Sequence, residues 1–189
     1  MNTLNPPLSR AEWRFVLWWV LATIIGWAAG FYVCEGLKAF LLQLKTSAPD
    51  GLILGFFIGI AQIFALRGRI GSLGWWFLAS TIGFAAGKAA GDALTQSIPG
   101  IFGAVLDGAI IGVVLGLVEW LIVRKYSTQA GWWVLATAIA WAVGWGIIST
   151  VDDAAGKPVA TSYLIGGIGA AIAGVITGIS LVLLLRRRT

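Results

Sequence analysis

Six apolar runs of membrane-spanning length take up most of the chain, at about 15–37, 51–66, 75–95, 101–123, 131–150 and 161–185. A helix needs about 20 residues to cross a hydrocarbon core of about 30 Å. The second run is short, so we expect its helix to extend back through Ala48-Pro49-Asp50 or to tilt. Of the 189 residues, 59% are hydrophobic and 11% charged, whereas soluble domains carry roughly 25% charged residues. The sequence predicts an all-α integral membrane protein with six transmembrane helices.

An internal repeat divides these helices into pairs. Trp18-Trp19 recurs 57 positions on, at 75 and again at 132. At the same spacing Gln62 matches Glu119, whereas the third copy of the even helices is displaced by 62 positions and has five extra residues near 152–158. We therefore predict one bundle over 1–189, built from three tandem two-helix hairpins at 13–67, 70–124 and 127–186.

The charged residues separate by membrane side. One side holds the basic residues Arg10, Arg14, Arg67, Arg69, Arg124, Lys125, Arg186, Arg187 and Arg188, with Glu12 as its only acid. The positive-inside rule predicts that this side, with both termini, is cytoplasmic. The net charge of +5 then reports topology, and no nucleic-acid partner is expected because the charge is spread over four loops.

Small residues recur every three or four positions on the predicted helices. On the even-numbered helices they include Gly55, Gly59, Gly112, Gly116, Gly174 and Gly178. Such residues let transmembrane helices approach closely. They predict packing within the bundle, which a closed six-helix ring would use in full, or an outward face that docks a partner helix.

A second stripe on the odd-numbered helices is aromatic and polar. Its paired tryptophans near the basic side are typical of an interfacial belt. Deeper aromatic residues are either packed against lipid tails and neighbouring glycines or form the wall of an apolar cavity for a lipid or carotenoid: Trp27, Phe84, Trp141 and Trp145.

Polar side chains are expected to share one layer inside the membrane, about 7.5 Å from the basic ends of the helices: Thr23, Gln62, Ser80, Glu119 and Thr137. The third hairpin interrupts this layer with Leu181. An ionisable residue within the membrane predicts a functional site, so Glu119 is the main candidate for contact with a ligand, proton or ion. The alternatives are a polar clasp between helices or a carboxylate that reaches Arg124.

Near the other side, Lys88 and Asp92 are spaced for an ion pair on one helix, and Glu35 matches Asp92 in the repeat. They predict either interface anchors or an outer vestibule. Asp50 and Asp107 each precede a glycine at an expected helix start, which predicts N-caps.

Several chemistries are excluded. The chain has no histidine and one cysteine, Cys34, so a haem or another metal held by histidine, a disulfide and a cysteine metal cluster are not expected. Because no catalytic motif is present either, we expect no enzyme and no required cofactor or metal.

One repeated motif consists of GxxxGxx followed by Gln or Glu, an arginine turn and GWWxLA. It occurs over 55–80 and again over 112–137. It resembles Trp- and Gly-rich multi-pass membrane proteins of cyanobacteria and green filamentous bacteria, a group with no known activity. The resemblance covers most of the chain and implies a bacterial inner or photosynthetic membrane, but no site residue.

Two functions follow as expectations. The first is a non-catalytic accessory or scaffold subunit that packs against partner membrane proteins or itself, with lipid or pigment in its aromatic grooves. The alternative is a small-solute or ion permease, or a substrate-binding membrane subunit, that uses the layer of Glu119 and Gln62. Membrane lipids are expected partners in either case.

Overall fold

The computed structural model describes residues 7–44, 46–152 and 159–186, and most of this part of the chain is helical. Six α-helices follow one another, with a short 3-10 helix (Leu42–Leu44) after the first: α1 (Arg10–Leu41), α2 (Ala48–Leu66), α3 (Leu73–Thr95), α4 (Gly100–Val123), α5 (Gly131–Asp152) and α6 (Val159–Arg186). The extension of the second helix back to Ala48 is as expected, with Pro49 in its first turn, where the missing amide proton has no helical partner to lose. Most of the insertion predicted near 152–158 lies outside the described residues, and so do Arg187 and Arg188.

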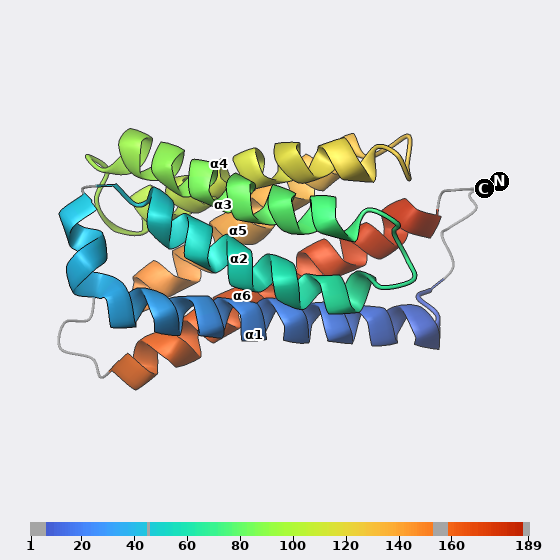
Figure 1. Cartoon of the computed structure of the whole chain (residues 1–189), viewed down its shortest axis with the longest axis horizontal. Helices are drawn as coiled ribbons and strands as arrows, with labels where there is room; N and C mark the ends of the chain where they lie inside the picture. Colours follow the sequence, from blue (N-terminus) through green and yellow to red (C-terminus); the bar gives the residue numbers. More distant parts are fainter. Residues whose placement is uncertain (1–6, 45, 153–158, 187–189) are drawn as a thin grey trace.

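The six helices form a closed ring. Among the described elements, each α-helix contacts its neighbours along the chain, and α1 also contacts α6. Helix α1 begins and α6 ends at the same end of the bundle, where the α2–α3 and α4–α5 turns also lie (Figure 1). We call this the terminal end and the other the opposite end. Because neighbours in the chain are also neighbours in space, short turns are sufficient to connect the ring.

Glu12 joins the two ends of the ring. Its carboxylate accepts hydrogen bonds from the backbone N–H (2.7 Å) and the hydroxyl (2.6 Å) of Ser9. The Ser9 hydroxyl in turn accepts the backbone N–H of Glu12 at 3.3 Å, which completes a capping box at the start of α1. The same carboxylate forms a two-point ion pair with Arg186 in the last turn of α6. Glu12 therefore caps the first helix and holds the last one beside it.

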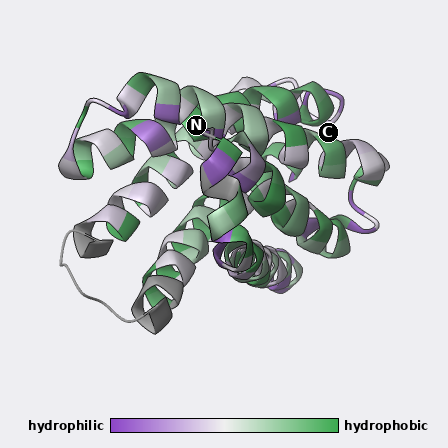
Figure 2. Cartoon of the chain, turned by 60° about the vertical axis from the view of Figure 1, so that its left-hand side comes forward, coloured by the Kyte–Doolittle hydropathy of each residue, from purple (hydrophilic) through white to green (hydrophobic). Residues whose placement is uncertain are grey.

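The helices are those of a multi-pass membrane protein. Five of them, α1, α2, α4, α5 and α6, are long and apolar enough to cross a membrane within the part of the chain described. The 23-residue α3 is less apolar because it carries Lys88 and Asp92, but it lies between α2 and α4 in the same ring. Hydrophobic residues dominate the helices (Figure 2), and many large apolar side chains are exposed on the outside of the ring, as a lipid environment requires.

The glycines predicted for helix packing face neighbouring helices of the ring. A β-carbon built on Gly55 would lie 2.5 Å from the Ser80 carbonyl oxygen, and one on Gly116 would lie 2.9 Å from the Val134 Cα. The same holds at the α6–α1 contact, where Gly174 lies against Val20. Gly59, Gly112 and Gly178 are equally close to the adjacent helix. The ring uses these stripes for its own contacts and leaves them no outward face.

Candidate functional site

The tryptophan pairs of α1, α3 and α5 divide between the outside and the centre of the ring. The first members are exposed: Trp18, Trp75 and Trp132. The second members, Trp19, Trp76 and Trp133, are fully buried, with ring centroids 5.7 Å apart between the first two and 5.8 Å between the last two. Successive residues of a helix point about 100° apart. The predicted interfacial belt is therefore wrong for the second members, which close the interior near the terminal end.

Each central tryptophan donates its indole N–H to a polar residue on an even-numbered helix. Trp76 donates to Gln62 Oε1 at 3.1 Å, and Trp133 donates to Glu119 Oε2 at 3.0 Å. Trp19 donates to Thr177 Oγ1 at 2.9 Å. These bonds place the predicted polar layer directly against the three tryptophans.

Thr177 supplies the third position of this layer, a role that the sequence reasoning missed. It lies one helical turn before Leu181, on the face that also carries Gly174 and Gly178. Leu181 itself is buried in the apolar cluster around the tryptophans. The expected interruption of the layer at Leu181 is therefore wrong. The shorter threonine reaches Trp19 from one turn further along, and helical spacing on this glycine face was the signal that could have found it.

Glu119 is held between α3 and α5. Its Oε1 accepts the Ser80 hydroxyl at 2.8 Å, while Oε2 accepts Trp133. Gln62 repeats this geometry: its amide nitrogen donates to Thr23 Oγ1 at 3.3 Å, and its oxygen accepts Trp76. Arg124 lies over the Trp120 ring instead of reaching Glu119.

The layer surrounds a cavity of about 10 Å³ at the centre of the ring, lined among others by Thr23, Gln62, Glu119, Thr137 and Thr177. The Thr137 hydroxyl donates to the Trp133 carbonyl oxygen at 2.6 Å. A cavity of this size is close to the smallest that holds one water molecule. The layer therefore has no room for a solute in this conformation.

We predict that Glu119→Gln leaves the fold and its stability nearly unchanged. The new amide can accept the Trp133 indole N–H and donate to Ser80, as Gln62 does with Trp76 and Thr23. Glu119→Leu should lower the free energy of unfolding by about 1–3 kcal/mol, because it leaves the buried indole N–H of Trp133 without an acceptor. Unfolding by sodium dodecyl sulfate in mild detergent measures both. Equal losses in the two variants would contradict a role as a polar clasp.

An aromatic layer separates this small cavity from the opposite end. Phe84 and Trp141 are buried and meet edge to face with centroids 4.7 Å apart. Trp141 also contacts Trp145 at 5.8 Å, and Trp27 is buried against Gly166 of α6. The residues predicted as an aromatic groove therefore face the inside of the ring. This position does not agree with the interpretation in which these residues pack against lipid tails.

Beyond this layer the ring contains a vestibule of about 770 Å³. Residues of α1, α2, α3 and α5 line it, and because α3 and α5 are not neighbours in the ring, the vestibule lies on the inside. Its lining combines three aromatic rings with five charged side chains: Trp27, Phe31 and Trp145, and Glu35, Lys38, Asp50, Lys88 and Asp92. The sequence had left open whether Lys88 and Asp92 mark such a vestibule or only the interface.

Lys88 is the centre of the charged cluster. Its ammonium binds Asp92 Oδ1 at 2.7 Å and Asp107 Oδ2 at 3.1 Å, and it lies 5.9 Å from the Trp145 ring centroid. Asp107 is not the predicted N-cap, because α4 begins seven residues earlier, at Gly100. It lies in the second turn of α4, with its side chain only 9% exposed. The Asp107 carboxylate compensates the charge of Lys88, which is itself mostly buried on α3.

Asp50 gives the vestibule an excess of negative charge. It lies in the first turn of α2, where Ser47 is the N-cap residue, so it does not cap the helix either. Lys88 is matched by two carboxylates, and Lys38 by Glu35 at 3.2 Å. Within the described residues the Asp50 side chain forms no hydrogen bond or ion pair. Among the described residues that line the vestibule, three carboxylates stand against two lysines, and such an excess favours cations over anions.

Comparison with known proteins adds no assignment to this geometry. No protein-family model, no curated protein and no solved structure matches the chain.

Proposed function

We propose that the protein is a non-catalytic membrane subunit that binds a small amphipathic cation in its vestibule. The observation that carries the proposal is the pairing of aromatic rings with surplus carboxylates in one cavity of about 770 Å³, within the range of small-molecule sites. With the termini in the cytoplasm, as the basic residues predict, the vestibule would open to the exterior.

The chemistry of the lining supports a ligand with one positive charge and one flat apolar part. Asp50 and Asp92 offer carboxylate oxygens near the mouth, and the Trp145 ring already lies near the ammonium of Lys88. Aromatic faces attract cations within about 6 Å of the ring centroid. Trp27 and Phe31, stacked at 5.0 Å, offer an apolar surface deeper in the vestibule. Lys88 does not attract an anion, because the carboxylates of Asp92 and Asp107 compensate its charge.

The scaffold role has less support than binding. The glycine stripes that could have docked a partner helix are used inside the ring. Continuous conduction is also disfavoured, because the aromatic layer and the three central tryptophans fill the interior between the vestibule and the terminal end. A transport cycle built on this site would have to open both layers, with Glu119 and Gln62 between them.

Three ligands that share an indole ring and differ in charge test the proposal: tryptamine, 3-ethylindole and indole-3-propionate. We expect tryptamine to bind the purified protein at least tenfold more tightly than indole-3-propionate, measured by titration calorimetry in a non-ionic detergent. The neutral indole should fall between them, because it keeps the aromatic contacts and lacks the charge.

The double variant Asp50→Asn, Asp92→Asn should remove most of this charge preference. Glu119→Gln serves as the matched loss of an acid, because Glu119 lies outside the vestibule lining and its replacement should leave the fold unchanged. If all three ligands fail to bind the wild type, or if the double variant keeps the preference for tryptamine, the proposal is wrong.

A further inference from the structure

We infer that a groove on the outside of the ring, between α1 and α2, binds an anionic phospholipid, with its phosphate at Arg14 and Arg69 and an acyl chain along the groove. The groove has a volume of about 780 Å³ and is lined almost entirely by apolar side chains. Among the described residues that line it, Arg14 and Arg69 are the two that carry a charge. The inference is independent of the function proposed for the vestibule.

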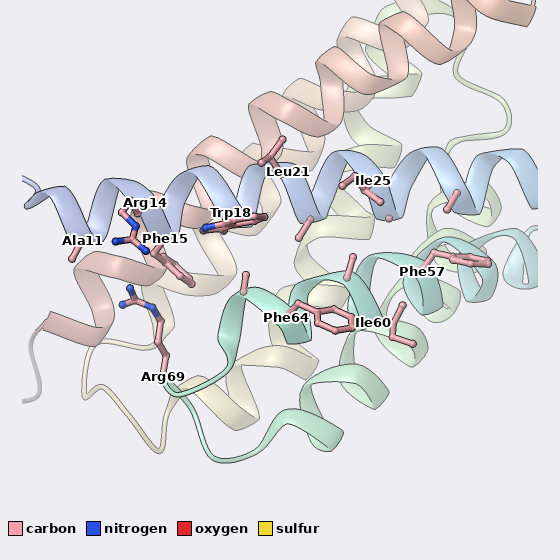
Figure 3. A pocket seen from close by; sticks show the side chains of 15 residues that line it. Ala11, Arg14, Phe15, Trp18, Leu21, Ile25, Phe57, Ile60, Phe64 and Arg69 are labelled. Atoms are coloured by element: carbon pink, nitrogen blue, oxygen red, sulfur yellow. The ribbon is translucent and has the colours of Figure 1, made fainter.

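The charge of the groove is concentrated at one end. Arg14 lies in the second turn of α1, and Arg69 lies in the turn after α2. Both side chains lie at the terminal end of the groove and point toward each other (Figure 3). Neither guanidinium forms an ion pair with an acid of the described chain. Two facing guanidinium groups without an acid between them form a site for an anion such as a phosphate.

Arg69 is held in place before any lipid binds. Its guanidinium carbon lies 4.3 Å from the centroid of the Phe15 ring, and its backbone N–H donates to the Leu66 carbonyl oxygen at 2.9 Å. Phe15 is itself buried in the apolar cluster around the central tryptophans. A cation preorganised on a buried ring loses little conformational freedom when it binds a phosphate.

The apolar part of the groove fits one acyl chain. Small residues form its floor: Ala22, Gly26 and Ala29 on α1, and Ala61 and Ala65 on α2. From Arg14 to Ala29 the helix rises roughly 22 Å at 1.5 Å per residue, whereas half of the hydrocarbon core is about 15 Å thick. An acyl chain that starts at the arginines therefore has room to lie along the groove to the middle of the bilayer.

The second hairpin shows what the same positions look like without such a site. Fifty-seven residues on, Gly71 and Tyr126 replace the two arginines, and the Gly71 N–H donates to the Tyr126 hydroxyl at 3.0 Å. Val118 and Ile122 replace Ala61 and Ala65. Because the second hairpin lacks both the wide floor and the basic end, the groove between α1 and α2 does not follow from the repeat alone.

The test compares phosphatidylglycerol with phosphatidylcholine of the same acyl chains, added to delipidated protein in a neutral detergent. We expect phosphatidylglycerol to bind at least tenfold more tightly by native mass spectrometry. The variant Arg14→Gln, Arg69→Gln should lose this preference, whereas Arg124→Gln, Lys125→Gln, which removes two positive charges from the corresponding turn of the second hairpin, should keep it. Equal loss in both variants, or none in either, would overturn the site.

A second variant tests the acyl chain separately from the headgroup. Ala61→Val, Ala65→Ile copies the residues of the second hairpin and should fold, because both positions lie at the groove surface. It should weaken phosphatidylglycerol binding at least threefold while leaving both arginines in place. If binding is unchanged, or if inorganic phosphate competes as well as the lipid does, the groove holds no acyl chain and the inference is wrong.

Discussion

Gly55→Ala should lower the free energy of unfolding by about 1–3 kcal/mol, although it adds a single methyl group. The new β-carbon would lie 2.5 Å from the Ser80 carbonyl oxygen, 2.8 Å from the Phe84 Cβ and 2.9 Å from the Thr81 Cα. Two of these three atoms belong to the backbone of α3, so no side-chain rotation relieves the contact. The helices would have to separate, and the polar layer that Ser80 joins would separate with them. Unfolding by sodium dodecyl sulfate in mild detergent measures the loss.

Gly167→Ala is the matched control for this change. Gly167 lies inside α6, and a β-carbon there would meet no atom of the described chain within 4 Å. Alanine is the better helix former by roughly 0.5–1 kcal/mol, so the control should be neutral or slightly stabilising. If the two variants lose the same stability, close helix contact is not what holds the ring together.

The sequence was sufficient for the elements because each physical signal was local. Apolar length marks the spans, and the short second run pointed to the start of α2 at Ala48. The spacing of Gly55, Gly59 and their counterparts predicted close contacts because a helix has a fixed period. The closed ring could also be predicted from the sequence. Glycine stripes occur on every even-numbered helix, and all of them can form close helix contacts when each helix has two neighbours.

The site was harder to predict because it depends on which face of each helix turns inward. Trp18 and Trp19 are the same residue type at almost the same position along α1. Only the packing of the ring decides that Trp19 is the buried one. Thr177 was missed because an alignment position pointed to Leu181, whereas the hydrogen bond needs only a hydroxyl within reach of Trp19. Asp107 was misplaced because its Asp-Gly pair resembles a helix start, although the helix begins at Gly100. Its true partner, Lys88, comes from a different helix.

Lys88→Met should be the most damaging single change in the vestibule, with a loss of about 3–5 kcal/mol in the free energy of unfolding. The lysine side chain is 18% exposed and that of Asp107 only 9%. Methionine keeps the length of the apolar stem but removes the cation, and the Asp107 carboxylate then stays buried without a counter-charge. Asp92→Asn should cost about 0–1 kcal/mol, because the Asp92 carboxylate is 46% exposed and water replaces the lost pair.

The double variant Lys88→Met, Asp107→Asn separates charge burial from packing. Asparagine has nearly the same shape as aspartate and needs no counter-ion, so the second substitution should restore most of the stability that Lys88→Met removes. Detergent-unfolding midpoints of the wild type, the two single variants and the double variant give the coupling energy directly. An additive result, with the double variant at least as unstable as the sum of the singles, would mean that Lys88 supports the ring through its apolar stem. Rescue would mean that Lys88→Met destabilises the ring because it leaves the Asp107 carboxylate buried between α3 and α4 without a counter-charge.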